Sequence, residues 1–200
     1  MDGIAWASSA MVAARTRLDI ATENLANVSS DGFRRCLARG RISAHGVEIT
    51  RVVSPDHGSL RHTGRPFDLA IVGDGVFRVR DAHGVVTTTR DGAFTRDRDG
   101  VLRDDAGRAL VGAHGVVRVA DGTAIDEHGI IVRDGTTVNR LELPPGSVVR
   151  AGYIETANVD AIGEMVGVLT AQRSFESAEK VVAAIDATHQ KAANDVARVK

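Results

Sequence analysis

The sequence has little of what most binding and catalytic sites are built from. Aromatic residues make up only 4% of its 200 residues, and Cys36 is its single cysteine. So few aromatics disfavour a large ligand pocket or a base-stacking surface, and one cysteine excludes an internal disulfide and a thiolate metal cage. The formal net charge of −1 argues against nucleic acid or anionic lipid as a partner, because both select basic surfaces.

Long apolar runs are also missing. No stretch approaches the roughly 20 apolar residues that a helix needs to span a bilayer. Residues 3–14 are small and apolar, but Asp2 precedes them where a signal peptide carries a basic cluster. We therefore expect a retained helix without a cleaved signal peptide, and no membrane insertion.

Catalytic and cofactor motifs are incomplete. Gly73-Asp74-Gly75 lacks the third glycine and the following helix of a dinucleotide fingerprint. The segment 97–100 begins like a calcium loop, but Leu102 and Arg108 stand where glycine and glutamate are required. Five of the seven histidines directly precede glycine, which predicts turns rather than metal ligation. We expect no catalytic residues, no cofactor and no metal, and therefore no enzyme.

Both ends of the chain carry an apolar repeat of seven residues, in two rows each. The first end has Ile4, Met11, Leu18 and Leu25, with Ala7, Ala14, Ala21 and Val28 three residues behind. The second end has Val168, Phe175, Val182 and Val196, with Ala171, Ala178, Ile185, Ala192 and Val199. Two such rows form one narrow helix face, the pattern of a coiled coil. Each end therefore predicts a helix that another helix must cover.

Glycines punctuate the middle of the chain every six to nine residues from Gly75 to Gly135, and most follow aspartate or histidine. Asp-Gly predicts two-residue hairpin turns, because both residues tolerate positive φ, and short β-rich runs lie between these turns. The sequence thus predicts an α+β fold, in which an antiparallel, glycine-turn-rich β domain is framed by coiled-coil-forming terminal helices. The expected parts are an N-terminal assembly helix over 1–32, a β domain with its connector over 33–152, and a C-terminal assembly helix over 153–200 that packs with the first. Within the second part, the basic segment 34–41 is expected to be a solvated linker, with a docking patch for an acidic neighbour as the alternative.

Single residues at the helix ends carry further expectations. Gly32 suits a left-handed cap that ends the first helix. Asn158 or Asp160 suits the N-cap of the second helix. Gly163, Gly167 and Ala171 form a small-residue stripe that favours close approach of another helix, with a flexible start of the helix as the alternative.

Several blocks resemble the bacterial flagellar rod and hook protein family. Residues 23–34 (Glu-Asn-Leu-Ala-Asn-Val-Ser-Ser-Asp-Gly-Phe-Arg) are similar to its amino-terminal signature, Asn-Asn-Leu-Ala-Asn, a Ser/Thr turn and Gly-Phe-basic. Residues 67–77, 89–94 and 99–102 resemble the opening of its β domain, and 152–160, 164–166 and 171–176 resemble its carboxyl-terminal signature. Glu23, Thr88 and Ala157 depart from the usual residues. The opening Met1-Asp2 and the segment 68–71 resemble proximal-rod members most and distal-rod members next.

The resemblance implies a structural subunit of the flagellar basal-body rod that self-assembles through its terminal helices into the axial shaft. Its partners would be copies of itself, neighbouring rod proteins and the flagellar type III export apparatus. It would lie in the periplasm-spanning rod. Distal-rod or hook-type membership is one alternative, and a β-domain binding module that its helices merely dimerise is another.

The residues expected at the assembly interface come from the two rows and the two signatures. Asn24 and Asn27 are expected to hydrogen-bond across helices or to cap the turn, and the polar residues of the second helix are expected beside its apolar row. The full set is Leu18, Asn24, Leu25, Asn27, Val28, Gly32, Phe33, Gly163, Gly167, Val168, Gln172, Arg173, Phe175, Glu176, Val182 and Ile185.

Overall fold

The computed structural model describes residues 3–44 and 46–198 and divides into two compact units. Unit 1 comprises Met1–Val28, Arg35–Pro55 and Val159–Lys200, and unit 2 comprises Ser29–Arg34 and Asp56–Asn158. The α+β class is confirmed, with one helix toward each end of the chain and antiparallel strand pairs between them. Each unit is described by itself below.

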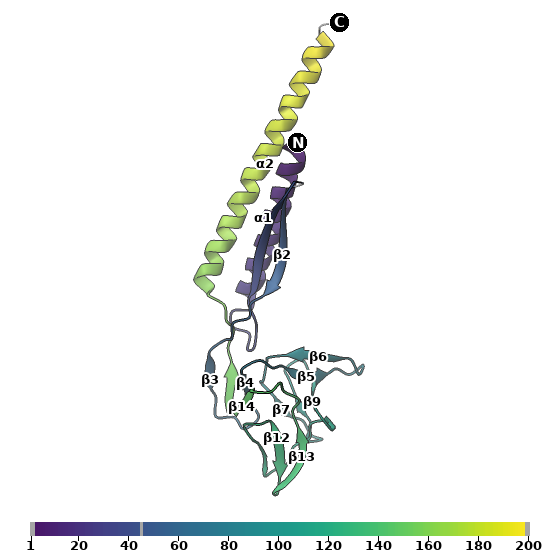
Figure 1. Ribbon diagram of the computed structural model, residues 1–200, viewed down its shortest axis with the longest axis vertical. Helices are drawn as coiled ribbons and strands as arrows, with labels where there is room; N and C mark the ends of the chain where they lie inside the picture. Colours follow the sequence, from purple (N-terminus) through teal and green to yellow (C-terminus); the bar gives the residue numbers. More distant parts are fainter. Residues whose placement is uncertain (1–2, 45, 199–200) are drawn as a thin grey trace. The chain divides into compact units, whose positions relative to one another are not determined.

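Unit 1 consists of two helices and a hairpin (Figure 1). Helix α1 runs over Gly3–Ala26 and helix α2 over Ala161–Arg198. The Asp160 carboxylate accepts a hydrogen bond from the Ile162 N–H at 3.1 Å, so Asp160 is the N-cap of α2, one of the two predicted positions. Neither helix, over its described residues, is long and apolar enough to cross a bilayer.

The prediction that residues 34–41 form a solvated linker is wrong. Strand β1 (Cys36–Ser43) occupies most of that segment and pairs antiparallel with β2 (Gly46–Val53), from Cys36 opposite Val53 to Ser43 opposite Gly46. The hairpin belongs to unit 1 with the helices. Its strands are mostly exposed. The basic segment therefore lacks the alternation of apolar and polar residues that predicts a half-buried strand.

Unit 2 contains the remaining strands, all paired antiparallel. The largest sheet has the order β6-β5-β9-β8-β7, with β10 paired to β9; β11-β12-β13 form a second sheet, and β14-β4 and β15-β3 form two pairs. The strands are β3 (Leu60–His62), β4 (Leu69–Val72), β5 (Phe77–Arg80), β6 (Val86–Thr89), β7 (Thr95–Arg96), β8 (Leu102–Arg103), β9 (Ala109–Gly112), β10 (Gly115–Val116), β11 (Thr123–Ile125), β12 (Ile130–Arg133), β13 (Thr136–Arg140), β14 (Val148–Ala151) and β15 (Tyr153–Glu155).

One apolar core holds these sheets together. Phe77 and Phe94 meet edge to face in it, with ring centroids 5.3 Å apart, the arrangement that aromatic pairs prefer. The sequence alternation that predicted β structure places Val79, Val117 and Val119 inward. The buried members of the core are Leu69, Ile71, Phe77, Val79, Phe94, Leu102, Leu110, Val117, Val119, Ile131, Leu141 and Val149.

The turns of unit 2 follow a different rule from the predicted one. Among the described residues, only Asp134 precedes its glycine with a positive φ, 50°. In four other turns an aspartate three residues before the glycine organises the loop: its carbonyl accepts the glycine N–H and its carboxylate accepts backbone N–H groups beyond it. These are Asp81–Gly84, Asp97–Gly100, Asp104–Gly107 and Asp126–Gly129. These turns are stabilised by hydrogen bonds from backbone N–H groups of the following residues to the aspartate side chain. The Asp-Gly dipeptide therefore does not identify the aspartate that shapes each turn.

Candidate assembly surface

The inner faces of α1 and α2 meet along the predicted rows. A Cβ added to Gly167 would lie 3.6 Å from the Ala21 Cβ, and one added to Gly3 would lie 3.6 Å from the Ile185 Cδ1. The helices are therefore antiparallel, with Ala21 opposite Gly167 and Gly3 opposite Ile185. Alanines of both rows are buried between or beside the helices: Ala7, Ala14, Ala21, Ala171 and Ala178.

The predicted interface residues differ in burial, and Asn24 is the one that is fully buried. The large apolar ones are half-buried within the chain: Leu18, Leu25, Val28, Val168, Phe175, Val182 and Ile185. The polar ones of α2, Gln172, Arg173 and Glu176, are exposed, as is Gly163. The three atoms nearest to an added Cβ at Gly163 all belong to Asp160, whereas an added Cβ at Gly167 would meet Ala21 of α1. The small-residue stripe therefore approaches α1 at Gly167, and Ala171 is buried. The side chains of Val196 and Val199 lie outside the described residues.

Asn24 was expected to hydrogen-bond across helices or to cap the turn, but its side chain bonds to the start of β1 instead. Its side chain is 1% exposed, donates to the Cys36 carbonyl at 2.8 Å and accepts from the Cys36 N–H at 2.8 Å. It thus fixes the start of β1 against the end of α1. Burial also raises the pKa of the Cys36 thiol, which disfavours the nucleophilic thiolate form. Asn27 donates to the Glu23 carbonyl in the last turn of α1 at 2.9 Å, which corresponds to the expected capping of the turn.

We expect Asn24→Ala to destabilise unit 1 markedly. The substitution leaves the buried N–H and C=O of Cys36 without their partner, and an unsatisfied buried group costs about 1–3 kcal/mol. Trp6 is the single tryptophan and lies in α1, so its fluorescence during urea unfolding reports on this unit. Asn27→Ala is the matched control and should lower the free energy of unfolding by about 0.5–1 kcal/mol. Equal losses in the two variants would contradict the role given to Asn24.

The hairpin is held against α1 by further polar contacts that sequence reasoning missed. The Ser9 hydroxyl accepts the Val47 N–H at 3.1 Å, and Glu23 forms an ion pair with Arg51. Arg35 donates to the buried carboxylate of Glu164 on α2. Alternation of Val47 with exposed charged residues in β2 is the signal that could have revealed the strand. These contacts make α1, α2 and the hairpin one unit.

Gly32 and Phe33 lie in unit 2, where they join β15. Gly32 has φ +69°, which confirms its predicted left-handed conformation. The predicted role as the cap of the first helix is wrong, because α1 ends six residues earlier at Ala26 and the Gly32 N–H donates to the Glu155 carbonyl at 2.7 Å. The Phe33 carbonyl accepts the Asn158 N–H at 3.3 Å. The segment that leaves the first helix and the segment that enters the second are therefore bonded side by side.

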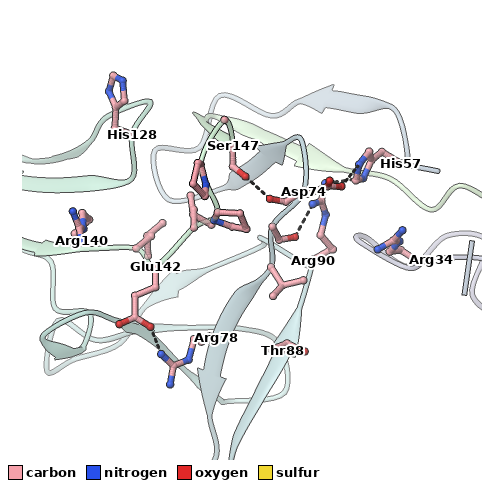
Figure 2. A pocket seen from close by; sticks show the side chains of 17 residues that line it. Arg34, His57, Asp74, Arg78, Thr88, Arg90, His128, Arg140, Glu142 and Ser147 are labelled. Carbon is pink, nitrogen blue, oxygen red and sulfur yellow. Dashed lines mark hydrogen bonds and ion pairs between the residues drawn. The ribbon is translucent and has the colours of Figure 1, made fainter. Parts of the chain in front are cut away.

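A buried ion pair anchors these segments to the sheets. Arg90 and Glu155 have side chains 3% exposed and form a 2.7 Å ion pair. The Arg90 guanidinium also donates to the carbonyls of Ile71, Gly73 and Gly75 at 2.7–2.9 Å. Its Nη2 lies 3.0 Å from the His57 Nδ1, and Figure 2 shows His57 and Asp74 beside it. Every hydrogen-bonding direction of the guanidinium is used, so Arg90 is a structural residue.

The cavity next to Arg90 has no catalytic arrangement. It has a volume of about 860 Å³, and its charged lining residues include the ion pair between Arg78 and Glu142 (Figure 2). The Ser147 hydroxyl donates to the Asp74 carbonyl and has no histidine base in that bond. In the described part of the chain, no three histidine, cysteine, aspartate or glutamate side chains gather as metal ligands.

Three family models match the chain in succession. They are "Flagella basal body rod protein" over residues 4–34, "Flagellar hook protein FlgE/F/G D1 domain" over 70–138 and "Flagellar basal body rod FlgEFG protein C-terminal" over 150–195. The chain is 30% identical to the flagellar basal-body rod protein FlgF of Mesorhizobium japonicum, over 88% of this chain and 90% of that one. The chain belongs to the flagellar basal-body rod protein family. It is accordingly a structural protein of the flagellum and not an enzyme.

The chain is also similar to another rod protein and to a hook protein. It is 25% identical to the basal-body rod protein FlgG of Agrobacterium fabrum, over 93% of this chain and 96% of that one. The flagellar hook protein FlgE of Brucella melitensis is 32% identical over 68% of this chain, but over only 36% of its own length. The rod proteins thus match along nearly their whole length, and the hook protein along a part.

Proposed function

We propose that this chain is a subunit of the proximal rod and that it self-assembles through α1 and α2 in a coiled-coil manner. The observation that carries the proposal is the outward side of the two helices. Val12 of α1 is 63% exposed, and Ile162 and Leu169 of α2 are 75% and 58% exposed. Large apolar side chains on the outside of a helix pair that is already packed inside favour contact with further helices.

Partners and location follow from the same proposal. The chain would contact copies of itself and neighbouring rod proteins, and would be exported through the flagellar type III apparatus without a cleaved signal peptide. It would lie in the periplasm-spanning part of the rod. Its net charge of −1 supports the exclusion of nucleic acid as a partner.

The position within the rod is the finer part of the proposal. The 30% identity to a FlgF over 90% of that protein favours the proximal rod, while a FlgG that matches over 96% of its length makes the distal rod the alternative. A helix-dimerised binding module would expose no further apolar helix face after dimerisation. The exposed side chains on both α1 and α2 favour a subunit with more than one neighbour.

Electron cryo-microscopy of isolated basal bodies tests the function directly. A strain without this gene should be non-motile, and the full-length chain supplied in trans should restore swimming. We expect density for both helices and for the β domain in the axial stack of the restored strain, on the proximal side of the distal-rod protein. A motile deletion strain, or basal bodies that lack the chain, would overturn the proposal.

A further inference from the structure

Helix α1 carries a second repeat that faces away from α2. Starting at Ala5, its positions recur at alternating three- and four-residue steps, the spacing of a continuous helix face. Every member is exposed, and all but Val12, Arg15 and Asp19 are small. The row is Ala5, Ser8, Val12, Arg15, Asp19, Thr22 and Ala26, and we call it the α1 outer row.

Helix α2 carries a matching row on the side opposite its contact with α1. It follows the same alternation of four- and three-residue steps and begins with large apolar residues. Its members are all exposed as well. The row is Ile162, Val166, Leu169, Arg173, Glu176, Lys180, Ala183 and Ala187, and we call it the α2 outer row.

The two outer rows complement each other in size. The α1 outer row ends in Thr22 and Ala26, whose short side chains let a neighbouring helix come close. The α2 outer row begins with Val166 and Leu169, 57% and 58% exposed, whose side chains suit such a shallow surface. Because each row faces away from the partner helix of its own chain, the two rows can meet only between different copies.

We infer that the α2 outer row of one copy packs antiparallel against the α1 outer row of the next copy, displaced by about one helical turn from the pairing within the chain. The inference rests on the proposed rod function, which supplies neighbouring copies with a shared helix direction. Such a contact joins two different surfaces, so it can repeat from copy to copy, and it builds an open helical assembly when the rotation between copies does not close a ring.

Charge selects the register. Within the chain, Gly167 lies opposite Ala21. The same register between copies would place Arg173 opposite Arg15, two like charges. A shift of about one turn, roughly 5 Å along the helix, places Arg173 opposite Asp19 and Glu176 opposite Arg15 instead.

The shifted register also matches the apolar positions. It places Leu169 opposite the uncharged Thr22, which offers its methyl group, and Val166 opposite Ala26, whereas the unshifted register places Leu169 opposite Asp19. Exposed ion pairs add little affinity, so their part here is to reject the wrong register, as charges do at other helix interfaces. The apolar contacts supply the attraction.

Paired cysteines test the register in the full-length chain. In a Cys36→Ser background, Thr22→Cys with Leu169→Cys marks the shifted register, and Asp19→Cys with Leu169→Cys marks the unshifted one. A disulfide requires Cα atoms about 4.4–6.8 Å apart, which distinguishes positions one turn apart. After mild oxidation of basal bodies, we expect the first pair to give dimers and higher multimers of this chain, at least tenfold more than the second pair.

A charge exchange gives an independent measurement. Arg173→Asp would oppose Asp19 across the interface, and we expect it to cut swimming at least threefold. Adding Asp19→Arg to the same chain should restore most of the loss. A stronger product from the unshifted pair, disulfides to a different protein only, or no rescue by the exchange would overturn the inference. Absence of the unmodified chain from basal bodies would instead overturn the proposed function.

Discussion

Phe175→Asp is expected to abolish incorporation of the chain into the rod while unit 2 stays folded. The predicted apolar row of α2 that contains Val168, Phe175 and Val182 is called the α2 inner row here. Phe175 has its largest side chain and is half-buried. A carboxylate brought there without a partner costs several kcal/mol, enough to separate α2 from α1. Soft-agar motility and immunoblots of purified basal bodies measure incorporation. Limited proteolysis of residues 56–158, in which the core of unit 2 lies, checks that unit 2 is intact.

The control adds the same charge to the same helix on an exposed position. Gln190 is exposed, so Gln190→Asp changes the net charge and the helix propensity of α2 without touching the inner row. We expect this variant to enter basal bodies and support normal swimming. Wild-type motility with Phe175→Asp would show that α2 does not assemble through its inner row, and loss with both variants would point to the charge alone.

The helices and their inner rows could be predicted because helix packing leaves a strong periodic signal. Alternating three- and four-residue steps of alanine, leucine and valine define one face, and the contact of Gly167 with Ala21 lies on that face. The outer rows could not be predicted because charged residues interrupt their apolar pattern: Arg15 and Asp19 in α1, and Arg173, Glu176 and Lys180 in α2. The second buried strip of α1, with Ala13 and Ile20, also went unseen, since it exists only because the hairpin covers it.

The hairpin and the buried ion pair could not be predicted from local patterns. Strand β1 is exposed at most of its positions, so it lacks the alternation that marks a half-buried strand. Arg90 and Glu155 are 65 residues apart in sequence, and each alone resembles a surface charge. Their pairing depends on the fold that brings β15 beside β4 and the turn that follows it. Long-range polar contacts of this kind produce no regular spacing of residues in the sequence from which they could be predicted.

The turns show an intermediate case. The glycines mark where the chain reverses, since positive φ favours glycine. The residue that shapes most of these turns is the aspartate three positions earlier, as at Asp97, whose pKa Arg103 lowers through a side-chain hydrogen bond. The dipeptide Asp-Gly therefore predicted the location of the turns better than their geometry.

Gly32→Val should stop rod completion even though the altered residue lies outside both helices. A valine at φ +69° is strained by about 1–3 kcal/mol. Its Cβ would also lie 2.2 Å from the Asp91 N and 2.4 Å from the Arg90 carbonyl carbon. The backbone that holds Arg90 must then move, which loosens the ion pair to Glu155 and the junction at β15. We expect secretion of the chain to persist, because an unfolded export substrate does not need this turn, while motility and basal-body incorporation are lost.

Gly107→Val separates the clash from the backbone strain. Gly107 has φ +77° with nothing within 4 Å of an added Cβ, so valine there carries the same strain in open space. We expect this variant to lower the free energy of unfolding by about 1–3 kcal/mol and still to assemble. Of these two glycines, Gly32 is the one that lies against the Arg90 backbone. The difference between the two variants in basal-body immunoblots therefore measures how much incorporation depends on the contact of the Gly32 segment with Arg90 and β15. If both variants fail to assemble equally, backbone strain explains the loss. If Gly32→Val also blocks secretion, residues 23–34 act mainly as an export signal. Full motility with Gly32→Val would show that the contact of Gly32 with β15 does not need this conformation.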